Sequence, residues 1–383
     1  MAGMDLTFRQ QREDRPRHKK KSIGEDRMGV YIGNAAAILA AGWIAHRYKD
    51  KKWVSGLYLF GIWCIWTLLG GLRTGIGTDY NHYYNLFYEA GAIQTVHDLF
   101  SQREEWLYLL LNKLVYLFSA DFRVYLLLYS GLLYMGFLIF YQRYSRNLSM
   151  SLWLFTAFEF FAISLCFMRQ AAAILLVLYA YVDLTKGKRL RAVILILLGA
   201  GFHWSALCAL AAVVLGEIRW SRGRAAAACV GAGILLFAMR WILPTLLHTV
   251  LSRYQVYEGT PFLENGHPAL AFFPAVLGAW ILYGISRTEK KWEEREHRYA
   301  AIAAVLGIVM ALYSCQYLIL ERITLYFSAY ATVSIPQIRR DMKKKEQEDG
   351  FYYKTAEGIL LFISLVAFVF YLKNDRYGVV PYR

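Results

Sequence analysis

The segment 72–84 brings together residue types that could act on a phosphate-bearing substrate. It contains Arg73, Asp79, Tyr80, His82, Tyr83 and Tyr84. An arginine can bind phosphate through two parallel hydrogen bonds, and a carboxylate can act as a base or orient a hydroxyl group. The segment begins where a long apolar run ends. This chemistry would therefore take place at the rim of a membrane domain.

Composition indicates what kind of domain that is. Apolar residues make up 57% of the 383 residues, and charged residues only 19%. Several apolar runs approach the roughly 20 residues that a helix needs to cross a bilayer. These features predict an all-α, polytopic integral membrane protein. The apolar runs lie at 29–45, 54–72, 106–118, 123–141, 149–166, 170–185, 190–216, 225–243, 269–286, 299–315, 322–336 and 356–372.

The cysteines and the net charge exclude other classes of site. The five cysteines lie in or beside apolar runs without paired spacing, so we interpret them as packing residues rather than disulfides or metal ligands. The net charge of +15 fits basic cytoplasmic loops. It does not indicate a nucleic-acid partner.

The connections between the runs differ in charge, and this difference predicts their side of the membrane. Six connections are rich in Lys and Arg: 46–53, 142–148, 186–191, 217–224, 287–298 and 337–355. The positive-inside rule places these six in the cytoplasm. The segment 73–105 then lies outside, so an odd number of crossings must separate it from 142–148.

This parity changes the interpretation of two runs. The run 106–118 is short, so we predict a re-entrant or interfacial helix on the outer side. The run 190–216 has basic connections at both ends and a Gly-Ala-Gly-Phe-His sequence at its centre, which predicts a broken hairpin of two short helices. About ten spanning helices remain. A single long span through 190–216 is the alternative, and it would reverse the side of every later segment.

The first 27 residues conflict with this topology, because they are rich in Lys and Arg but would have to lie outside. Met28 opens directly into the first apolar run, so we hypothesise that native translation starts there. The alternative is a genuine cytoplasmic tail, with 29–45 not fully spanning. The predicted organisation is a basic tail 1–27, a single membrane domain 28–372 and a short external tail 373–383.

Four arginines lie at or near the outer ends of spans, where the charge pattern does not explain them: Arg73, Arg169, Arg253 and Arg322. A polyprenyl diphosphate presents its diphosphate at about this depth, and arginine suits bidentate contacts with phosphate. We therefore predict a diphosphate clamp. In the alternative interpretation, each arginine snorkels to the interface or pairs with an acid such as Glu321 or Asp79.

Three other ionisable residues are candidates for acid–base chemistry. Asp79 follows Gly77 and Thr78, so a helix cap or turn explains it as well as a catalytic carboxylate does. His203 lies at the predicted helix break, where it could take a proton from a hydroxyl group at neutral pH. A buried structural histidine is the alternative. Glu159 is an acid within an apolar run and could pair with Arg169.

The sequence shows no spacing typical of a metal or nucleotide site. It has no HExxH, no paired cysteines and no Walker motif. The pair Gly75 and Gly77 follows a membrane helix rather than a strand, so it is no dinucleotide fingerprint. We therefore expect no metal, no cofactor and no nucleotide-sugar donor.

Five segments resemble, in order along the chain, motifs of the EpsG family of Wzy-like exopolysaccharide and O-antigen polymerases. They are LRTGIGTDYNHYYNLF at 72–87, EWLYLLLN at 105–112, FMRQAAA at 167–173, GFHWSAL at 201–207 and RITLYF at 322–327. The matches span most of the membrane domain. The tail 1–27 and the loop 244–268, where only Arg253 and Tyr254 can be aligned, depart from the family pattern.

The resemblance implies that the chain joins lipid-linked oligosaccharide repeats on the outer face of the bacterial cytoplasmic membrane, without a metal or nucleotide. The implied catalytic residues are His203, Asp79, Arg73, Arg169 and Arg322, with either His203 or Asp79 as the base. The implied substrate-binding residues are Tyr80, Tyr83, Glu105, Asn112, Gln170, Arg253, Tyr254 and Tyr326. The implied partners are a polyprenyl-diphosphate oligosaccharide, membrane lipid, a flippase and a chain-length regulator.

Two rival functions stay open. Another polyprenyl-linked glycosyltransferase, such as an O-antigen-ligase-like enzyme, would use similar outer arginines. A lipid-linked oligosaccharide flippase or transporter would often show an internal repeat with paired broken helices. The sequence shows one broken hairpin and no clear twofold repeat, which counts against a transporter.

Overall fold

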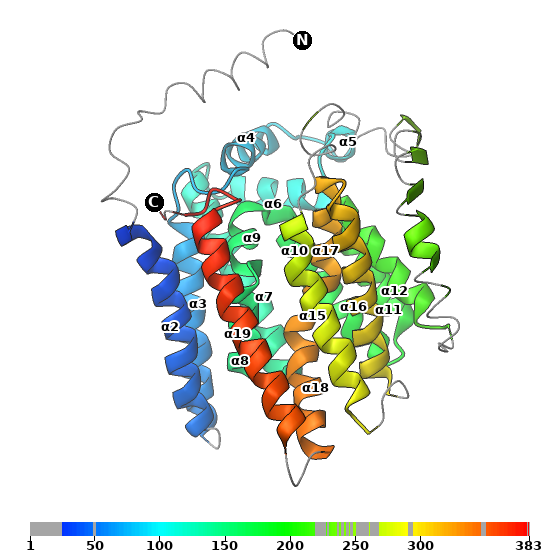
Figure 1. Cartoon of the computed structure of the whole chain (residues 1–383). Coiled ribbons are helices and arrows are strands. Elements are labelled where there is room, and N and C mark those ends of the chain that lie inside the picture. The colour runs from blue at the N-terminus through cyan, green and yellow to red at the C-terminus, as the bar shows by residue number, and fades with distance from the viewer. Residues whose placement is uncertain are drawn as a thin grey trace.

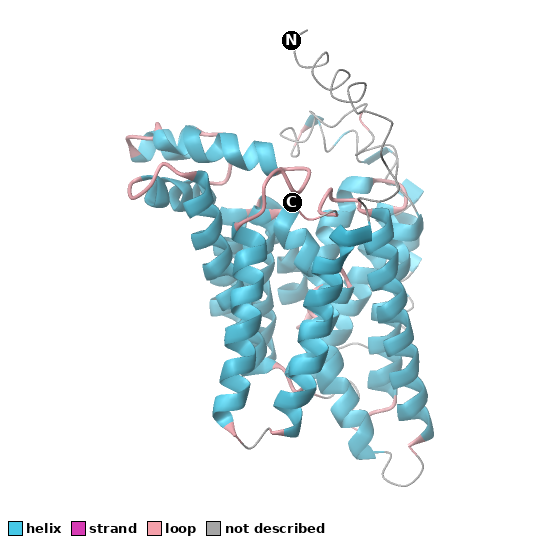
Figure 2. Cartoon of the chain, turned by 90° about the vertical axis from the view of Figure 1, so that its left-hand side faces the viewer, coloured by secondary structure: helices cyan, strands magenta, loops and turns pink. Residues whose placement is uncertain are grey.

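The computed structural model shows a bundle of helices that run between two ends, with short helices lying across one of them (Figures 1 and 2). It describes residues 25–48, 51–218, 268–289, 294–345 and 350–380, with residue 382 and scattered positions between 227 and 260. Within these residues the regular structure is helical, and they contain no strand. The all-α prediction is confirmed for this part of the chain.

Several of the described bundle helices are long and apolar enough to cross a membrane. Six described helices meet this requirement: α2 (Glu25–Arg47), α3 (Lys52–Gly71), α7 (Phe122–Tyr144), α10 (Met168–Thr185), α16 (Arg295–Ser314) and α19 (Phe351–Asn374). The count rises to eight if two bent pairs each form one span. These pairs are α8 (Leu148–Ala157) with α9 (Phe160–Cys166), and η3 (Leu318–Leu320) and α17 (Glu321–Ser328) with α18 (Ala331–Lys345). The protein has a multi-pass membrane architecture.

The predicted count of about ten spans is not confirmed. The predicted span 269–286 corresponds to α15 (Pro268–Ser286), an apolar helix of 19 residues that is not counted among the six. The predicted span 225–243 is described only at scattered positions, and the tail 1–24 lies outside the described residues. The hypothesis of a start at Met28 therefore stays a prediction.

The described basic connections lie together at one end of the bundle, at the bottom of Figure 1. Successive helices run in opposite directions, so the turns after α7, α10 and α15 meet at this end. We call it the basic end. The grouping matches the charge pattern of the sequence. Its assignment to the cytoplasm stays a prediction.

Short helices lie across the opposite end, which we call the α6 end. They are α4 (Tyr80–Gly91), α5 (Val96–Ser101) and α6 (Trp106–Tyr116) (Figure 1). The buried positions of α6 are Tyr108, Leu109, Asn112 and Val115, which share one helical face. This face covers the bundle, so the run 106–118 is a short transverse helix and not a span.

The run 190–216 turns back on itself. It forms α11 (Arg189–Phe202), the 3-10 helix η1 (Trp204–Ala209) and α12 (Leu210–Leu215), with extended backbone at His203 between them. Arg189 and Glu217, at its two ends, form an ion pair. Both ends therefore lie at the basic end and His203 forms the tip. The predicted broken hairpin is confirmed, and the alternative of a single long span is wrong.

The span α8–α9 bends by 57° at Glu159, which has a positive φ of 65°. This conformation is uncommon for a residue with a side chain. The bend brings the last turn of α9 under Gly77, whose φ is +94°. A side-chain carbon on Gly77 would lie 3.2 Å from Cα of Cys166, so only glycine fits there without a shift.

The C-terminal tail is bound to the α6 end. The backbone N–H groups of Gly77 and Thr78 donate to the carbonyls of Gly378 and Tyr377, each at 2.9 Å. Tyr31 donates its hydroxyl to the carbonyl of Val379 at 2.5 Å. The sequence predicted only a short external tail, whereas these bonds make it part of the scaffold around 77–78.

The described cysteines agree with their predicted packing role. Cys64, Cys166, Cys208 and Cys315 are free, and Cys229 lies outside the described residues. Cys166 is buried, with its Sγ 3.0 Å from the hydroxyl of Thr78. A small thiol fits the tight space below Gly77.

Cysteine labelling can test the turn of the hairpin. Arg189→Cys and Glu217→Cys, in a cysteine-free background, should react with a membrane-impermeant maleimide from the same side of the membrane, because these positions are adjacent. Ala120→Cys, in the exposed turn before α7, should react from the other side. Labelling of positions 189 and 217 from opposite sides would contradict the hairpin.

Candidate functional site

Arg169 lies at the centre of a buried charge cluster at the α6 end. It stands in the first turn of α10, and its guanidinium contacts the carboxylates of Glu104 and Glu105, just before α6. The distance from Nη1 to Oε2 of Glu105 is 2.6 Å. Its Cζ lies 5.9 Å from the ring centre of Tyr83 and 6.0 Å from that of Tyr108. One cation thus connects α10 with α4 and α6.

Glu105 connects this cluster to the tip of the hairpin. Its Oε1 accepts a hydrogen bond of 3.3 Å from the backbone N–H of Trp204 and lies 3.4 Å from Nδ1 of His203. The interruption of the helix at His203 makes this contact possible, because the first backbone N–H groups of η1 have no helical partner. Arg169, Glu105 and His203 therefore form one continuous row from three separate segments.

Burial and neighbouring charges set the protonation of this row. Burial alone would raise the pKa of Glu105, but the nearby imidazole of His203 and the charge of Arg169 outweigh it and lower that pKa to about 2. Burial lowers the pKa of His203 below its usual value of 6.5 by more than Glu105 raises it. At neutral pH the carboxylate is ionised and the imidazole is neutral, so the imidazole can accept a proton.

Arg73 does not lie where the predicted clamp requires it. The residue is only 2% exposed, its Nη1 donates to the carbonyl of Gly70, and its Nη2 lies 3.0 Å from Sδ of Met168. It therefore connects the last turn of α3, where carbonyls lack helical partners, with the start of α10. In this position the guanidinium is turned to protein partners, and its predicted contact with a phosphate stays a prediction. Arg73 holds in place the helix that carries Arg169.

Among the described clamp arginines, Arg322 differs from Arg169 because no described carboxylate forms an ion pair with it. It is partly exposed, and its Cζ lies 4.6 Å from the ring centre of Phe167. The helix that carries it, α17, contacts η1 beside His203 through the hydrogen bond of 3.2 Å from Ser205 to Tyr326. Gln170 donates its Nε2 to the backbone carbonyl of Arg322 at 2.5 Å, which fixes α17 against α10.

Glu321 does not pair with any of the predicted clamp arginines in the described chain. Its two carboxylate oxygens accept hydrogen bonds of 2.7 Å from Arg376, and Tyr377 donates a third at 3.3 Å. Arg376 was not predicted, because the tail that carries it contains no recognisable motif. Its opposite charge to Glu321 was the only signal in the sequence. The carboxylate of Glu321 is thus occupied, which leaves Arg322 available.

Asp79 occupies the N-cap position of α4, but its side chain makes no capping hydrogen bond. Its Oδ1 instead accepts a hydrogen bond of 3.3 Å from Thr78. The capping hypothesis is therefore correct for the position and wrong for the hydrogen bond. This contact points Asp79 to its neighbour rather than to the row of Arg169, Glu105 and His203. A catalytic role for Asp79 stays a prediction.

Most of the predicted substrate-binding side chains are buried and pack inside the protein. Tyr80 is partly buried against Phe122, and five others are nearly inaccessible: Tyr83, Glu105, Asn112, Gln170 and Tyr326. Asn112 donates to the carbonyl of Tyr108 at 3.1 Å, and Tyr326 accepts from Ser205 at 3.2 Å. These side chains pack inside the protein, and their predicted role in substrate binding stays a prediction. Arg253 and Tyr254 lie outside the described residues.

Three side chains in or beside the cluster were not predicted as site residues: Glu104, His82 and Trp204. The Nε2 of His82 lies 3.4 Å from Nη2 of Arg169 and 3.8 Å from Oε1 of Glu104. Trp204 is 50% exposed beside His203 and offers an aromatic face on which a sugar ring could stack. The Glu104–Glu105 pair and the His203–Trp204 pair were visible in the sequence, but their contacts were not.

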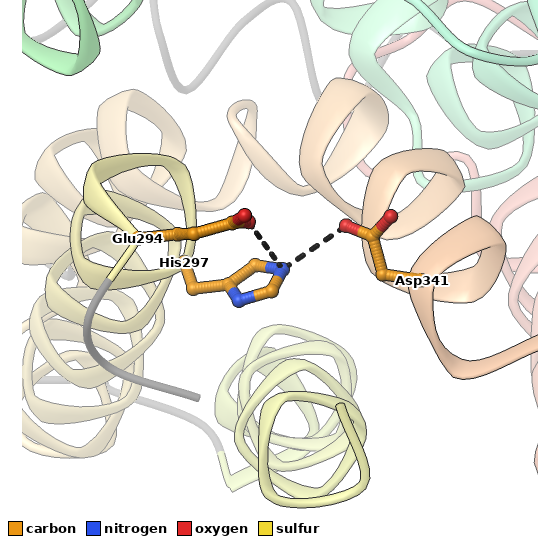
Figure 3. Close-up of side chains that lie close together, drawn as sticks. All are labelled: Glu294, His297 and Asp341. Atoms are coloured by element: carbon orange, nitrogen blue, oxygen red, sulfur yellow. Dashed lines mark hydrogen bonds and ion pairs between the residues drawn. The ribbon is translucent and has the colours of Figure 1, made fainter. Parts of the chain in front are cut away.

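A second group of ionisable side chains lies at the basic end. The Nε2 of His297 is 3.2 Å from Oδ2 of Asp341 and 3.8 Å from Oε2 of Glu294 (Figure 3). These residue types can hold a metal ion, and their spacing in the sequence gave no sign of it because they come from two helices. Asp341 also accepts a hydrogen bond of 2.8 Å from Gln337. A hydrogen-bonded cluster accounts for this geometry.

A comparison with protein families identifies the chain. The model of the EpsG family matches residues 27–383, nearly the whole chain. The chain belongs to the EpsG family. All five segments that resembled EpsG motifs lie within the match, and segments 105–112, 167–173 and 201–207 supply the row of Glu105, Arg169 and His203. No curated protein and no solved structure matches the chain.

The charge cluster of this EpsG protein predicts a specific pattern of stability. Arg169→Gln would leave Glu105 buried without its counter-charge, which typically costs about 3–5 kcal/mol. The double variant Arg169→Gln, Glu105→Gln should recover most of the lost thermal stability in detergent. Arg123→Gln removes an exposed arginine near the same end and is the control. Equal melting temperatures for Arg169→Gln and Arg123→Gln would contradict a structural role for the ion pair.

Proposed function

We propose that this protein is a polysaccharide polymerase that joins polyprenyl-diphosphate-linked oligosaccharide repeats. Membership of the EpsG family supports an exopolysaccharide polymerase-like role. The observation that carries the proposal is the row of Arg169, Glu105 and His203 at the α6 end. Under this proposal the α6 end faces the outside of the bacterial cytoplasmic membrane, with α6 at the interface.

His203 is the base in this proposal. The carboxylate 3.4 Å from its Nδ1 favours the tautomer with the proton on that nitrogen, which leaves the lone pair on Nε2. Nε2 then takes the proton from a hydroxyl group on the acceptor sugar. Glu105 is itself held by Arg169, so the orientation of the imidazole depends on the whole row.

The bond changes follow from this assignment. The acceptor oxygen, losing its proton to His203, attacks the anomeric carbon of the growing chain. The bond between that carbon and the diphosphate oxygen breaks, and its electron pair stays on the diphosphate. Arg322 would stabilise this charge, because it is partly exposed near His203 and its neighbour Glu321 is already occupied by Arg376. The exposed ring of Trp204 would stack on a sugar.

The proposal includes the other components that a polymerase needs. Its substrates come from a flippase that delivers lipid-linked repeats, and a chain-length regulator acts on the growing polymer. Asp79 is the alternative base, although its side chain faces Thr78 rather than the row. A ligase-like transferase would use the same row with a different acceptor.

Reconstitution tests the proposed reaction. The protein in liposomes, given only a polyprenyl-diphosphate oligosaccharide, should yield a ladder of polymers. His203→Ala should lower the rate at least roughly a hundredfold, as expected for loss of a general base, while the exposed His97→Ala should have little effect. A single addition would indicate a ligase-like enzyme, and translocation without a new glycosidic bond would indicate a flippase.

The pH dependence of the rate can identify the base. If His203 accepts the proton, activity should rise with pH through a midpoint below 6.5, because burial lowers the pKa of its imidazole and the neutral form is active. His203→Gln should remove this acidic limb. An acidic limb that persists unchanged in His203→Gln would show that another group, such as Asp79, is the base.

A further inference from the structure

A cavity of about 530 Å³ lies at the basic end, far from the row of Arg169, Glu105 and His203. Its walls come from the last turns of α7 and α10 and from the facing parts of α16 and α18. Pockets of roughly 300–1,000 Å³ are the usual size for small-molecule ligands. The cavity is therefore large enough to hold a ligand and not only a few waters.

The charged side chains that line the cavity are mostly basic. They are Arg143, Arg146, Lys186, Lys188 and Arg191, against the two acids Asp183 and Glu296. Their positive excess matches an anion. The cytoplasmic bias of Lys and Arg explains basic loops in general, but it does not require five such side chains from two connections to surround one cavity.

Protein contacts occupy only some of these cations. Arg191 places its Nε 2.9 Å from Oδ2 of Asp183, and Arg146 donates its Nε to Gln337 at 2.7 Å. Lys186 lies with its Nζ 4.5 Å from the ring centre of Tyr144. Among the described residues, no carboxylate forms an ion pair with Arg143 or Lys188. These two cations are the best placed to bind a ligand.

The hydroxyl of Ser334 provides an independent indication of a ligand. Ser334 lines the cavity, is 5% exposed, and its Oγ has no hydrogen-bond partner. A buried hydroxyl without a partner is costly, so such groups normally bind protein, water or a ligand. This hydroxyl could donate to an oxygen of an anion between the basic side chains.

The nearby carboxylates do not neutralise the cavity. Figure 3 shows Glu294 and Asp341 pointing toward the imidazole of His297, and neither residue lines the cavity. Their negative charges are therefore directed at His297, which forms part of the wall. The interior keeps the positive excess of the lysines and arginines.

We propose that this cavity is a binding site for a phosphate-bearing ligand, either a soluble phosphorylated compound or the headgroup of an anionic lipid. Arg143 and Lys188 would contact the phosphate oxygens, and Ser334 would donate a hydrogen bond to one of them. The site does not depend on the proposed polymerase reaction. It would be a second ligand-binding site, at the end of the bundle opposite to the row of Arg169, Glu105 and His203.

Binding of inorganic pyrophosphate tests the proposal. The full-length protein in phosphatidylcholine nanodiscs should bind pyrophosphate in a calorimetric titration. Arg143→Gln, Lys188→Gln should weaken binding at least tenfold, the effect expected for losing charge-assisted contacts. Ser334→Ala should weaken it by a smaller factor. The control Lys343→Gln, Lys345→Gln removes the same charge from exposed positions outside the cavity and should leave the affinity unchanged.

A second set of nanodiscs distinguishes the two sources of phosphate. If phosphatidylglycerol in the nanodisc prevents pyrophosphate binding at constant ionic strength, the lipid headgroup occupies the site. If binding persists, a soluble phosphorylated compound is the ligand. Absence of binding in phosphatidylcholine, or equal affinities for the cavity variant and the lysine control, would overturn the proposal.

Discussion

A guanidinium removed from water must be neutralised where it lies, and the α6 end is built around this requirement at Arg169. The cation stands at the start of α10 and contacts both carboxylates that precede α6. Arg169 carries one positive charge against two carboxylates, so one negative charge is not neutralised by it. Glu105 also faces the hairpin, where it accepts a hydrogen bond from the backbone N–H of Trp204 and lies close to Nδ1 of His203. The position of a transverse helix and the orientation of an imidazole therefore depend on the same buried charge.

The described clamp arginines differ in their contacts because their surroundings differ. Arg73 is enclosed by the end of α3 and the start of α10, so its charge serves packing. Arg169 is neutralised by two acids and orients other groups. Arg322 lies over the ring of Phe167, while the neighbouring carboxylate, Glu321, accepts hydrogen bonds from Arg376. In the proposed function Arg322 binds the substrate, and a cation in that role must not be neutralised by a protein carboxylate; the pairing of Glu321 with Arg376 meets this requirement.

Features that depend on length and charge could be predicted from the sequence. Run lengths and basic connections predicted the helices, the transverse α6 and the hairpin with His203 at its tip. Pairing between distant segments could not be predicted, since nothing in 104–105 specifies contact with residue 169 rather than with residues 73 or 322. The same limit applies to Arg376 with Glu321 and to His297 with Asp341. Burial of Tyr83 and Asn112 was hidden too, because tyrosine and asparagine suit packed interiors and sugar sites alike.

The C-terminal tail has a practical consequence for work on this protein. Its backbone pairs with Gly77 and Thr78, its Tyr382 donates to the carbonyl of Leu69 at 2.9 Å, and Arg376 holds Glu321. An affinity tag or reporter domain fused after residue 383 would strain the tail residues that hold Gly77 and Thr78 in the 72–84 loop. A purified fusion could thus be well folded and yet have a distorted 72–84 loop. Insertions between α18 and α19 would leave the hydrogen bonds of the C-terminal tail undisturbed.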